Sequence, residues 1–83
     1  MTVSALAYLA HQLYDKSIIE MPNEWNEAQD IAENSGLMEG AYVMTESIMD
    51  AYLGDVAEKY NMSIRDMQIM QNYIRNATLI GLS

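Results

Sequence analysis

The sequence predicts an all-α protein, a compact bundle of four or five helices in a single domain that covers residues 1–83. Apolar residues recur at intervals of three and four along the whole chain, which is the periodicity of helices with one buried side. Helix start and stop residues divide this pattern into segments of helical length. No segment alternates apolar and polar residues between turn signals, as a strand would, and 83 residues make one domain.

The first helix is expected over residues 4–19. Thr2 or Ser4 can cap its N-terminus, because their hydroxyl oxygens accept hydrogen bonds from free backbone N–H groups. The helix has to end before Pro22, since the residue that precedes a proline avoids the helical region. Its inward side comprises Leu6, Leu9, Ala10, Leu13 and Tyr14.

A second helix is expected between Asn23, as its N-terminal cap, and Gly36, whose tolerance of positive φ closes helices. At about 100° per residue, its apolar residues gather on one side and its acidic residues on the other. The apolar side holds Trp25, Ala28, Ile31 and Ala32, and the acidic side holds Glu27, Asp30 and Glu33.

The third helix is expected from Met38 to Leu53, with a break or bend at Gly54. Asp55 and Glu58 have the spacing of a capping box and would start the next helical segment. The inward residues of the third helix are Ala41, Met44, Ile48, Ala51 and Tyr52, and a separate acidic side holds Glu39, Glu46 and Asp50.

The last helix is expected to begin after Ser63, which forms a second capping box with Asp66. Met62 and Met67 are spaced as a hydrophobic staple, which fixes the angle at which the chain enters the helix. Met67, Met70, Ile74 and Tyr73 are then expected to point inward.

Charge is distributed unevenly along the chain. Twelve acids and four bases give a net charge of −8, yet residues 61–83 hold one acid and two bases. An acidic body is repelled by phosphate backbones and attracted to basic surfaces. The chain has no Cys, no basic leader before an apolar run and no unbroken apolar stretch of membrane-spanning length, so we expect a cytoplasmic protein without a membrane partner.

Catalytic and metal-binding patterns are missing from the sequence. His11 is the single histidine, and there is no Cys, no glycine-rich phosphate loop and no spacing of a calcium loop. Carboxylates that recur on amphipathic helices are usually solvated. We therefore expect a protein that is not an enzyme and needs no cofactor or metal.

One stretch resembles the helix-turn-helix proteins, over residues 53–72. A small residue at Ala57, a turn at Asn61 and apolar residues at Met62, Met67 and Met70 occupy the positions that lock two helices in that motif. The resemblance implies that the outward residues of the last helix enter the major groove of DNA. These residues are Ile64, Arg65, Gln68, Ile69 and Asn72, with Arg75 further along.

Two functions follow from these observations. The first is a small inhibitor or modulator whose acidic residues bind a basic partner protein in place of phosphates, with Ile64 and Ile69 as apolar anchors. The second is a dimeric DNA-binding regulator that uses Arg65, Gln68 and Asn72. DNA-binding interfaces commonly employ about six to ten basic contacts, whereas this chain has four basic residues, so the first function is preferred. A third alternative is a subunit of a larger assembly whose Met-rich helices pack on copies of the same chain.

Overall fold

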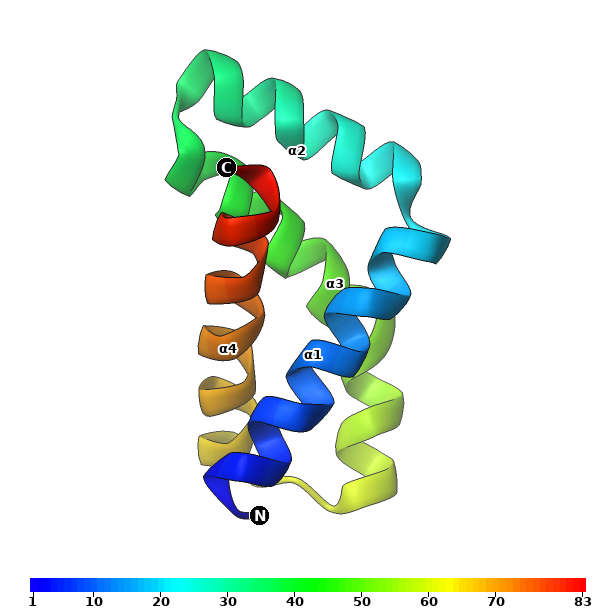
Figure 1. Cartoon of the computed structure of the whole chain (residues 1–83). Helices are drawn as coiled ribbons and strands as arrows, with labels where there is room; N and C mark the ends of the chain where they lie inside the picture. The colour runs from blue at the N-terminus through cyan, green and yellow to red at the C-terminus, as the bar shows by residue number, and fades with distance from the viewer.

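The computed structural model describes residues 1–83 and consists of four helices without strands (Figure 1). They are α1 (Val3–Glu20), α2 (Pro22–Ser35), α3 (Leu37–Tyr60) and α4 (Ile64–Leu82). Single residues, Met21 and Gly36, separate the first three helices, and residues 61–63 form the turn before α4. The expectation of an all-α bundle of four or five helices is confirmed.

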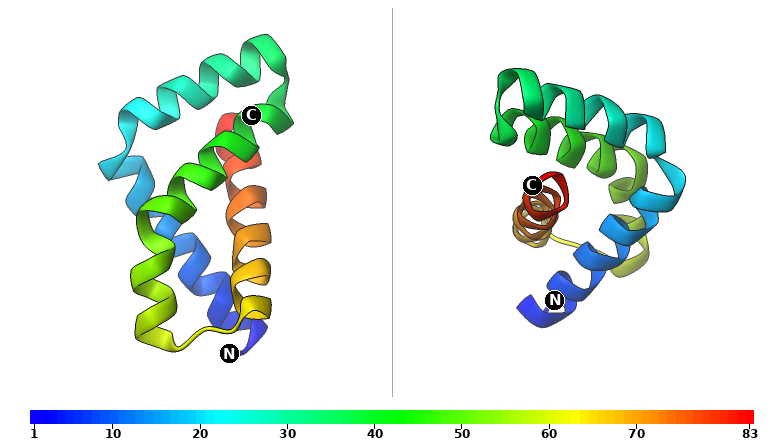
Figure 2. Two further views of the ribbon diagram at one scale, coloured as in Figure 1. Left: turned by 180° about the vertical axis from the view of Figure 1, so that it is seen from behind. Right: turned by 45° about the horizontal axis from the view of Figure 1, so that its top comes forward.

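Three pairs of helices are in close contact around one core: α1 with α4, α3 with α4, and α2 with α3. We call α1 with α4, and α2 with α3, the two helix pairs. α1 and α4 lie side by side and both run away from the end of the molecule that holds the N-terminus (Figure 1, Figure 2). α3 runs in the opposite direction behind them and packs on α4, while α2 lies against α3. The core therefore lies between α1, α3 and α4, and α2 covers it from one end.

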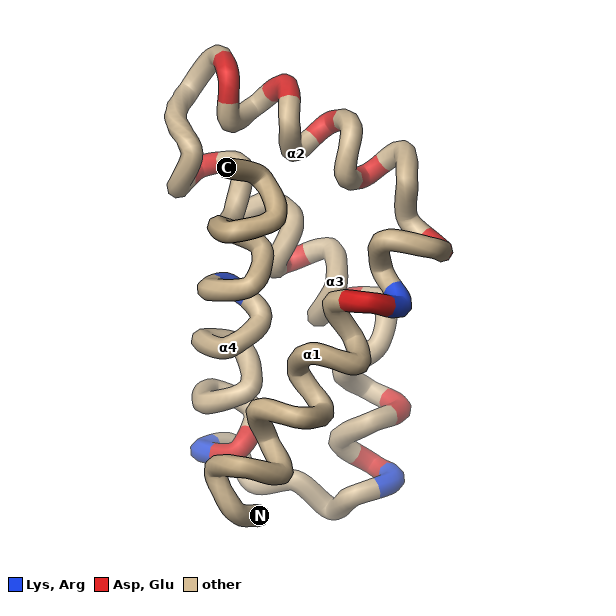
Figure 3. The backbone as a smooth tube through the Cα atoms, viewed as in Figure 1, with Lys and Arg blue, Asp and Glu red and all other residues tan.

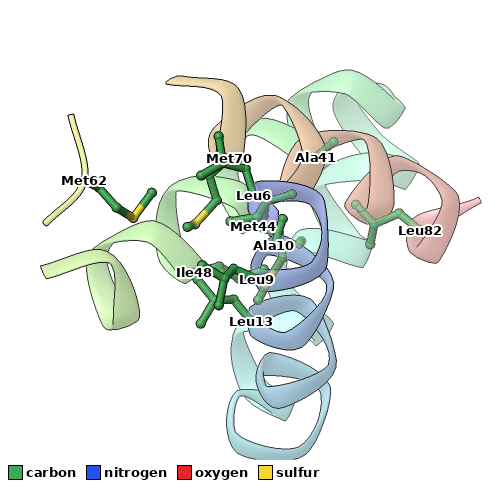
Figure 4. Packing of buried hydrophobic residues seen from close by; sticks show 12 residues of the cluster. Leu6, Leu9, Ala10, Leu13, Ala41, Met44, Ile48, Met62, Met70 and Leu82 are labelled. Carbon is green, nitrogen blue, oxygen red and sulfur yellow. The ribbon is translucent and has the colours of Figure 1, made fainter. Parts of the chain in front are cut away.

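The core is built from the residues with helical spacing on the inward sides of α1, α3 and α4 (Figure 4). Its side chains with no exposed surface include Leu6 from α1, Met44 and Ile48 from α3, and Met70 and Ile74 from α4. α2 contributes Ala28 alone, whereas Trp25 packs against the core while half-buried. Attachment of α2 thus depends on close contact by small residues and on the single large side chain of Trp25.

Two of the expected helix caps are confirmed. The Thr2 hydroxyl oxygen accepts a hydrogen bond of 3.1 Å from the backbone N–H of Ala5. Ser63 and Asp66 form the reciprocal capping box, because each side chain accepts a 3.1 Å hydrogen bond from the backbone N–H of the other residue. Asn61 has a φ of 49° in the turn before this box, the left-handed conformation that asparagine tolerates.

The expected cap at Asn23 is wrong, because α2 begins one residue earlier, at Pro22. Proline fits the first position of a helix, where its fixed φ suits the helix and its missing N–H would have no partner. Met21 takes the cap position without a side-chain hydrogen bond. Gly36 ends α2 as expected, with a φ of 106° that favours glycine.

Of the break or bend expected at Gly54, the break is wrong, since α3 continues through Gly54 to Tyr60 and Asp55 caps no helix. Gly54 has no positive φ and no neighbour within 4 Å of the position its Cβ would take, so it is an ordinary residue on the outer side of the helix. Ala51, expected to point inward, is exposed. A helix of 24 residues cannot keep every apolar residue on one side, because its buried side turns gradually around the axis.

The closest approach between helices occurs at Gly40 in α3. A Cβ at this position would lie 2.6 Å from the carbonyl oxygen of Ala28 and 2.8 Å from the Cβ of Ala32, both in α2. Neither atom belongs to a flexible side-chain end, so α2 would have to move. Gly40 therefore sets the distance at which α2 rests on α3.

We expect Gly40→Ala to lower the free energy of unfolding by about 1–3 kcal/mol, because the added methyl group forces α2 away from α3. Gly54→Ala is the matched control in the same helix and should raise it by about 0.5–1 kcal/mol, since alanine favours an unbroken helix. Urea unfolding followed by circular dichroism measures both changes. Destabilisation by Gly54→Ala would contradict a continuous α3, and a neutral Gly40→Ala would contradict the close approach.

Candidate functional site

Charge separates between the two helix pairs. α2 and α3 carry nine acids and one base, whereas α1 and α4 together carry three acids and three bases. Figure 3 shows acidic positions along the whole of α2, while long stretches of α1 and α4 carry no charge. The net charge of −8 therefore belongs to α2 and α3.

The first row of carboxylates lies on α2. Glu27, Asp30 and Glu33 are all exposed, on the side of the helix opposite buried Ala28. Their spacing of three residues corresponds to a rise of about 4.5 Å between successive carboxylates. The structure thus exposes the three predicted α2 residues to solvent in a row that turns by about 120° around the helix from Glu27 to Glu33.

The second row lies on α3. Glu39, Glu46 and Asp50 are exposed and fall within about 40° of one another around the helix. They point away from Met44 and Ile48, which are completely buried on the opposite side. We call Glu27, Asp30 and Glu33 with Glu39, Glu46 and Asp50 the acidic rows.

None of the carboxylates in the acidic rows pairs with a lysine or arginine. The single ion pair of the molecule joins the α-amino group of Met1 to Asp66, with 3.5 Å between nitrogen and oxygen. The hydrogen bond from the backbone N–H of Ser63, followed by the charge of the α-amino group, lowers the pKa of Asp66, against the opposing effect of desolvation. The acidic rows are left free to accept contacts from outside the molecule.

Three of the four basic side chains lie over tyrosine rings. The Lys16 nitrogen is 4.8 Å from the centroid of the Tyr52 ring, and the Arg75 guanidinium carbon is 5.9 Å from that of Tyr42. Lys59 lies 5.4 Å above the ring of its neighbour Tyr60. Such cation–π contacts hold the cations within the molecule's own surface. Arg65 is the one basic residue without such a contact.

The residues predicted on α4 do not form one surface. Arg65, Gln68 and Asn72 are exposed within about 60° of one another, and Ile64 is 73% exposed. The expected pair of exposed isoleucines is wrong, because Ile69 is half-buried and packs against the core. Five residues separate Ile64 from Ile69, which places them about 140° apart around the helix.

Two hollows were not predicted from the sequence. One, of about 310 Å³, lies between α1, α2 and the end of α4 and is lined by Tyr14, Ile18, Pro22, Trp25, Asn26 and Gly81. The second, also of about 310 Å³, lies on α4 and is lined by Ile69, Asn72, Tyr73 and Asn76. Both hollows are open at the surface. The residues that line the first come from three helices, and the sequence does not show that these helices lie next to one another.

No group of three or more histidine, cysteine, aspartate or glutamate side chains is arranged to hold a metal ion. His11 is exposed on α1 and its side chain makes no hydrogen bond. No helix combines the length and the apolar character that a membrane crossing requires. Comparison of the chain with protein-family models, curated proteins and solved structures finds no match.

Tyr52 connects the end of α1 to α3 beside the acidic residues. Its hydroxyl donates a 2.8 Å hydrogen bond to the Glu20 carboxylate. Burial, the hydrogen bond to Glu20 and the negative charges of Glu20 and Glu24 together raise the pKa of Tyr52 from 10.0 to about 12. The neutral phenol is therefore the form that this junction stabilises.

Subtracting the tyrosinate titration curve of Tyr52→Phe from that of the wild type isolates Tyr52. We expect this difference curve to have its midpoint near pH 12. Glu20→Gln should lower this midpoint, because it removes the carboxylate while burial of the ring remains. A raised folded-state pKa means that the contribution of Tyr52 to stability is complete below pH 10 and is lost as the pH rises toward 12. A Tyr52 midpoint of 10 in the wild type would contradict the contact between Tyr52 and Glu20. An unchanged midpoint in Glu20→Gln would contradict it as well.

Proposed function

We propose that the protein is a non-enzymatic binding module, a small inhibitor or modulator, whose acidic rows bind a basic surface of a partner protein. One observation carries the proposal. All six carboxylates of the rows are exposed, and none pairs with a lysine or arginine of the chain itself. Unpaired carboxylates in rows are costly to crowd together, so a partner that supplies cations relieves their mutual repulsion.

The spacing of the rows supports a nucleic-acid-binding surface as the target. Successive carboxylates on α2 rise by about 4.5 Å, and each strand of DNA carries a phosphate charge about every 3.4 Å along the axis. A groove whose lysines and arginines accept phosphates can therefore accept carboxylates in similar succession. The partner would be held by charge-assisted hydrogen bonds between its basic side chains and Glu27, Asp30 and Glu33.

An exposed apolar side chain, Ile64, begins α4 at the end of the molecule opposite α2 (Figure 1) and would be a separate anchor. Ile64 is 73% exposed and lies within about 20° of Arg75 around α4. Arg75 in turn contacts the ring of Tyr42 on α3, so Ile64 points along the side of α4 that borders α3. Ile69 no longer serves this purpose, because the core already holds it.

The test is recovery of basic proteins from a nuclease-treated cell extract by the immobilised chain. We expect recovery by the wild type and a loss of about ten-fold or more when the α2 row is neutralised, since three exposed ion pairs contribute roughly 0.5 kcal/mol each. The test variant carries Glu27→Gln, Asp30→Asn and Glu33→Gln. The control variant removes three exposed carboxylates outside the rows with Asp15→Asn, Asp55→Asn and Glu58→Gln.

The two variants have the same net charge, so their comparison separates the position of the carboxylates from their number. Equal losses in both would mean that only the overall charge attracts the recovered proteins, which contradicts a function of the rows. Recovery that disappears with nuclease would mean that nucleic acid bridges the proteins to the chain, and it would contradict the proposal as well.

A DNA-binding regulator is the second candidate, because Arg65, Gln68 and Asn72 share one exposed side of α4. Arginine to guanine and glutamine or asparagine to adenine are favoured base contacts. However, the other three cations lie over tyrosine rings, and Asn72 borders a hollow on α4. A single unengaged arginine is a small supply for a phosphate backbone.

We expect repeated selection from a pool of random DNA duplexes to enrich no sequence at physiological salt. Arg65→Glu provides the decisive comparison, since it removes the one cation without a tyrosine contact and should leave the capture of basic proteins within about two-fold of wild type. Enrichment of one duplex by the wild type, lost in Arg65→Glu, would establish the second candidate in place of the first.

A further inference from the structure

The most exposed apolar side chains lie on the helix pair that carries no net charge. Among large apolar residues, those with at least 49% exposure all belong to α1 or α4. They are Val3 at 55%, Tyr8 at 66%, Ile18 at 49%, Ile19 at 81%, Ile64 at 73% and Ile80 at 77%. Acidic α2 has no exposed large apolar side chain, and those of α3, namely Leu37, Met38, Tyr42, Val43 and Tyr60, are 37–47% exposed. The most exposed apolar side chains therefore lie away from the two acidic helices.

Three of these exposed residues, Val3, Ile18 and Ile80, share one face along α1 and α4 with four half-buried residues. On α1, Val3, Ala7, Tyr14 and Ile18 fall within about 60° around the helix, and on α4, Ile69, Tyr73 and Ile80 fall within about 40°. We call these seven residues the α1/α4 face. The two helices are joined at both ends of it, since Met1 pairs with Asp66 and Gly81 lies against the Tyr14 hydroxyl.

Both hollows of the molecule open on the α1/α4 face. Tyr14 and Ile18 line the hollow near the end of α1, and Ile69 and Tyr73 line the hollow on α4. Exposed Ile80 follows these residues on α4. The same face therefore offers protruding isoleucines and recesses of about 310 Å³, each large enough to receive an isoleucine side chain.

We propose that the α1/α4 face binds a second copy of this chain, so that the protein forms a two-fold symmetric dimer. A two-fold contact joins a surface to itself, and it therefore needs protrusions and recesses on the same face. The charge distribution of the chain is the reason to expect a second copy at this face. Two copies with a net charge of −8 repel each other through α2 and α3, and the seven residues of the α1/α4 face carry no charge.

The size of the face suits a dimer. A stable interface of standard size buries about 800 Å² per partner, roughly a sixth of the 5104 Å² that this chain exposes. Val3 is the first residue of α1 and Ile80 lies in the last turn of α4, so the α1/α4 face follows both helices along a molecule that is 37 Å long. A basic partner, by contrast, gains nothing from a face without carboxylates.

Dimerisation has consequences for both candidate functions. The contact would cover Asn72, which lines the hollow on α4, and would thereby remove one of the three residues that suit base recognition. It would leave the acidic rows of α2 and α3 on the outside of the dimer. The dimer does not depend on the proposed function, because its contact uses none of the six carboxylates.

The experiment compares Ile80→Glu with Ile64→Glu by sedimentation equilibrium. Both residues are exposed to a similar extent on α4, but they lie about 160° apart around the helix. We expect the measured mass of the wild type and of Ile64→Glu to rise from the chain mass of 9.4 kDa to twice that value as the protein concentration increases from about 1 µM to 1 mM. Ile80→Glu should weaken the dimer about ten-fold or more, because its carboxylate would be buried against apolar side chains.

Three outcomes decide the matter. Association that Ile80→Glu alone weakens supports the dimer through the α1/α4 face. A wild type that keeps a mass of 9.4 kDa up to about 1 mM overturns it. Equal effects of the two variants also overturn it, because the contact would then lie elsewhere on α4. None of these outcomes changes the result that we expect when the variant with neutralised carboxylates is tested for capture of basic proteins.

Discussion

The arrangement of the molecule depends on the backbone contact between α2 and α3 at Gly40. α2 has a single fully buried residue, Ala28, and therefore little apolar surface with which to attach itself. Attachment comes from the close approach at Gly40 and from Trp25, whose indole N–H donates a 3.1 Å hydrogen bond to Ser17. Trp25 also packs edge-on against Tyr14, with ring centroids 5.6 Å apart. Because small residues and one tryptophan suffice, the rest of α2 is free to be acidic.

This attachment brings the two most acidic helices together and leaves α1 and α4 as a neutral pair. Repulsion among unpaired carboxylates disfavours the compact state, so the rows are retained at a cost in stability unless a partner neutralises them. No lysine or arginine forms an ion pair with a carboxylate of the rows, and Lys16, Lys59 and Arg75 lie over tyrosine rings instead. Two surfaces of different chemistry result, one that attracts cations and one that is apolar and carries no net charge.

Much of the fold could be predicted from local signals in the sequence. The helical spacing of Leu6 or Met44 and the caps at Thr2 and Ser63 depend only on residues within one or two turns, and the structure confirms them. The exposure of the acidic rows follows from the same periodicity. The break expected at Gly54 is absent because glycine ends a helix only where the backbone needs its freedom, which neighbouring sequence does not reveal. The tyrosine contacts of the cations and the two hollows involve separate helices, whose packing no local pattern specifies.

The separation of the two surfaces can be tested in one set of backbone amide spectra of the labelled protein. Addition of an arginine-rich peptide should shift the amide signals of α2 and α3 near the acidic rows, while dilution of the protein alone should shift those of α1 and α4. Peptide-induced shifts distributed equally over Asp15, Asp55 and Glu58, or dilution shifts at the carboxylates of the acidic rows, would contradict two distinct binding surfaces. Shifts confined to the acidic rows on one side and to the α1/α4 face on the other are the result that this structure predicts.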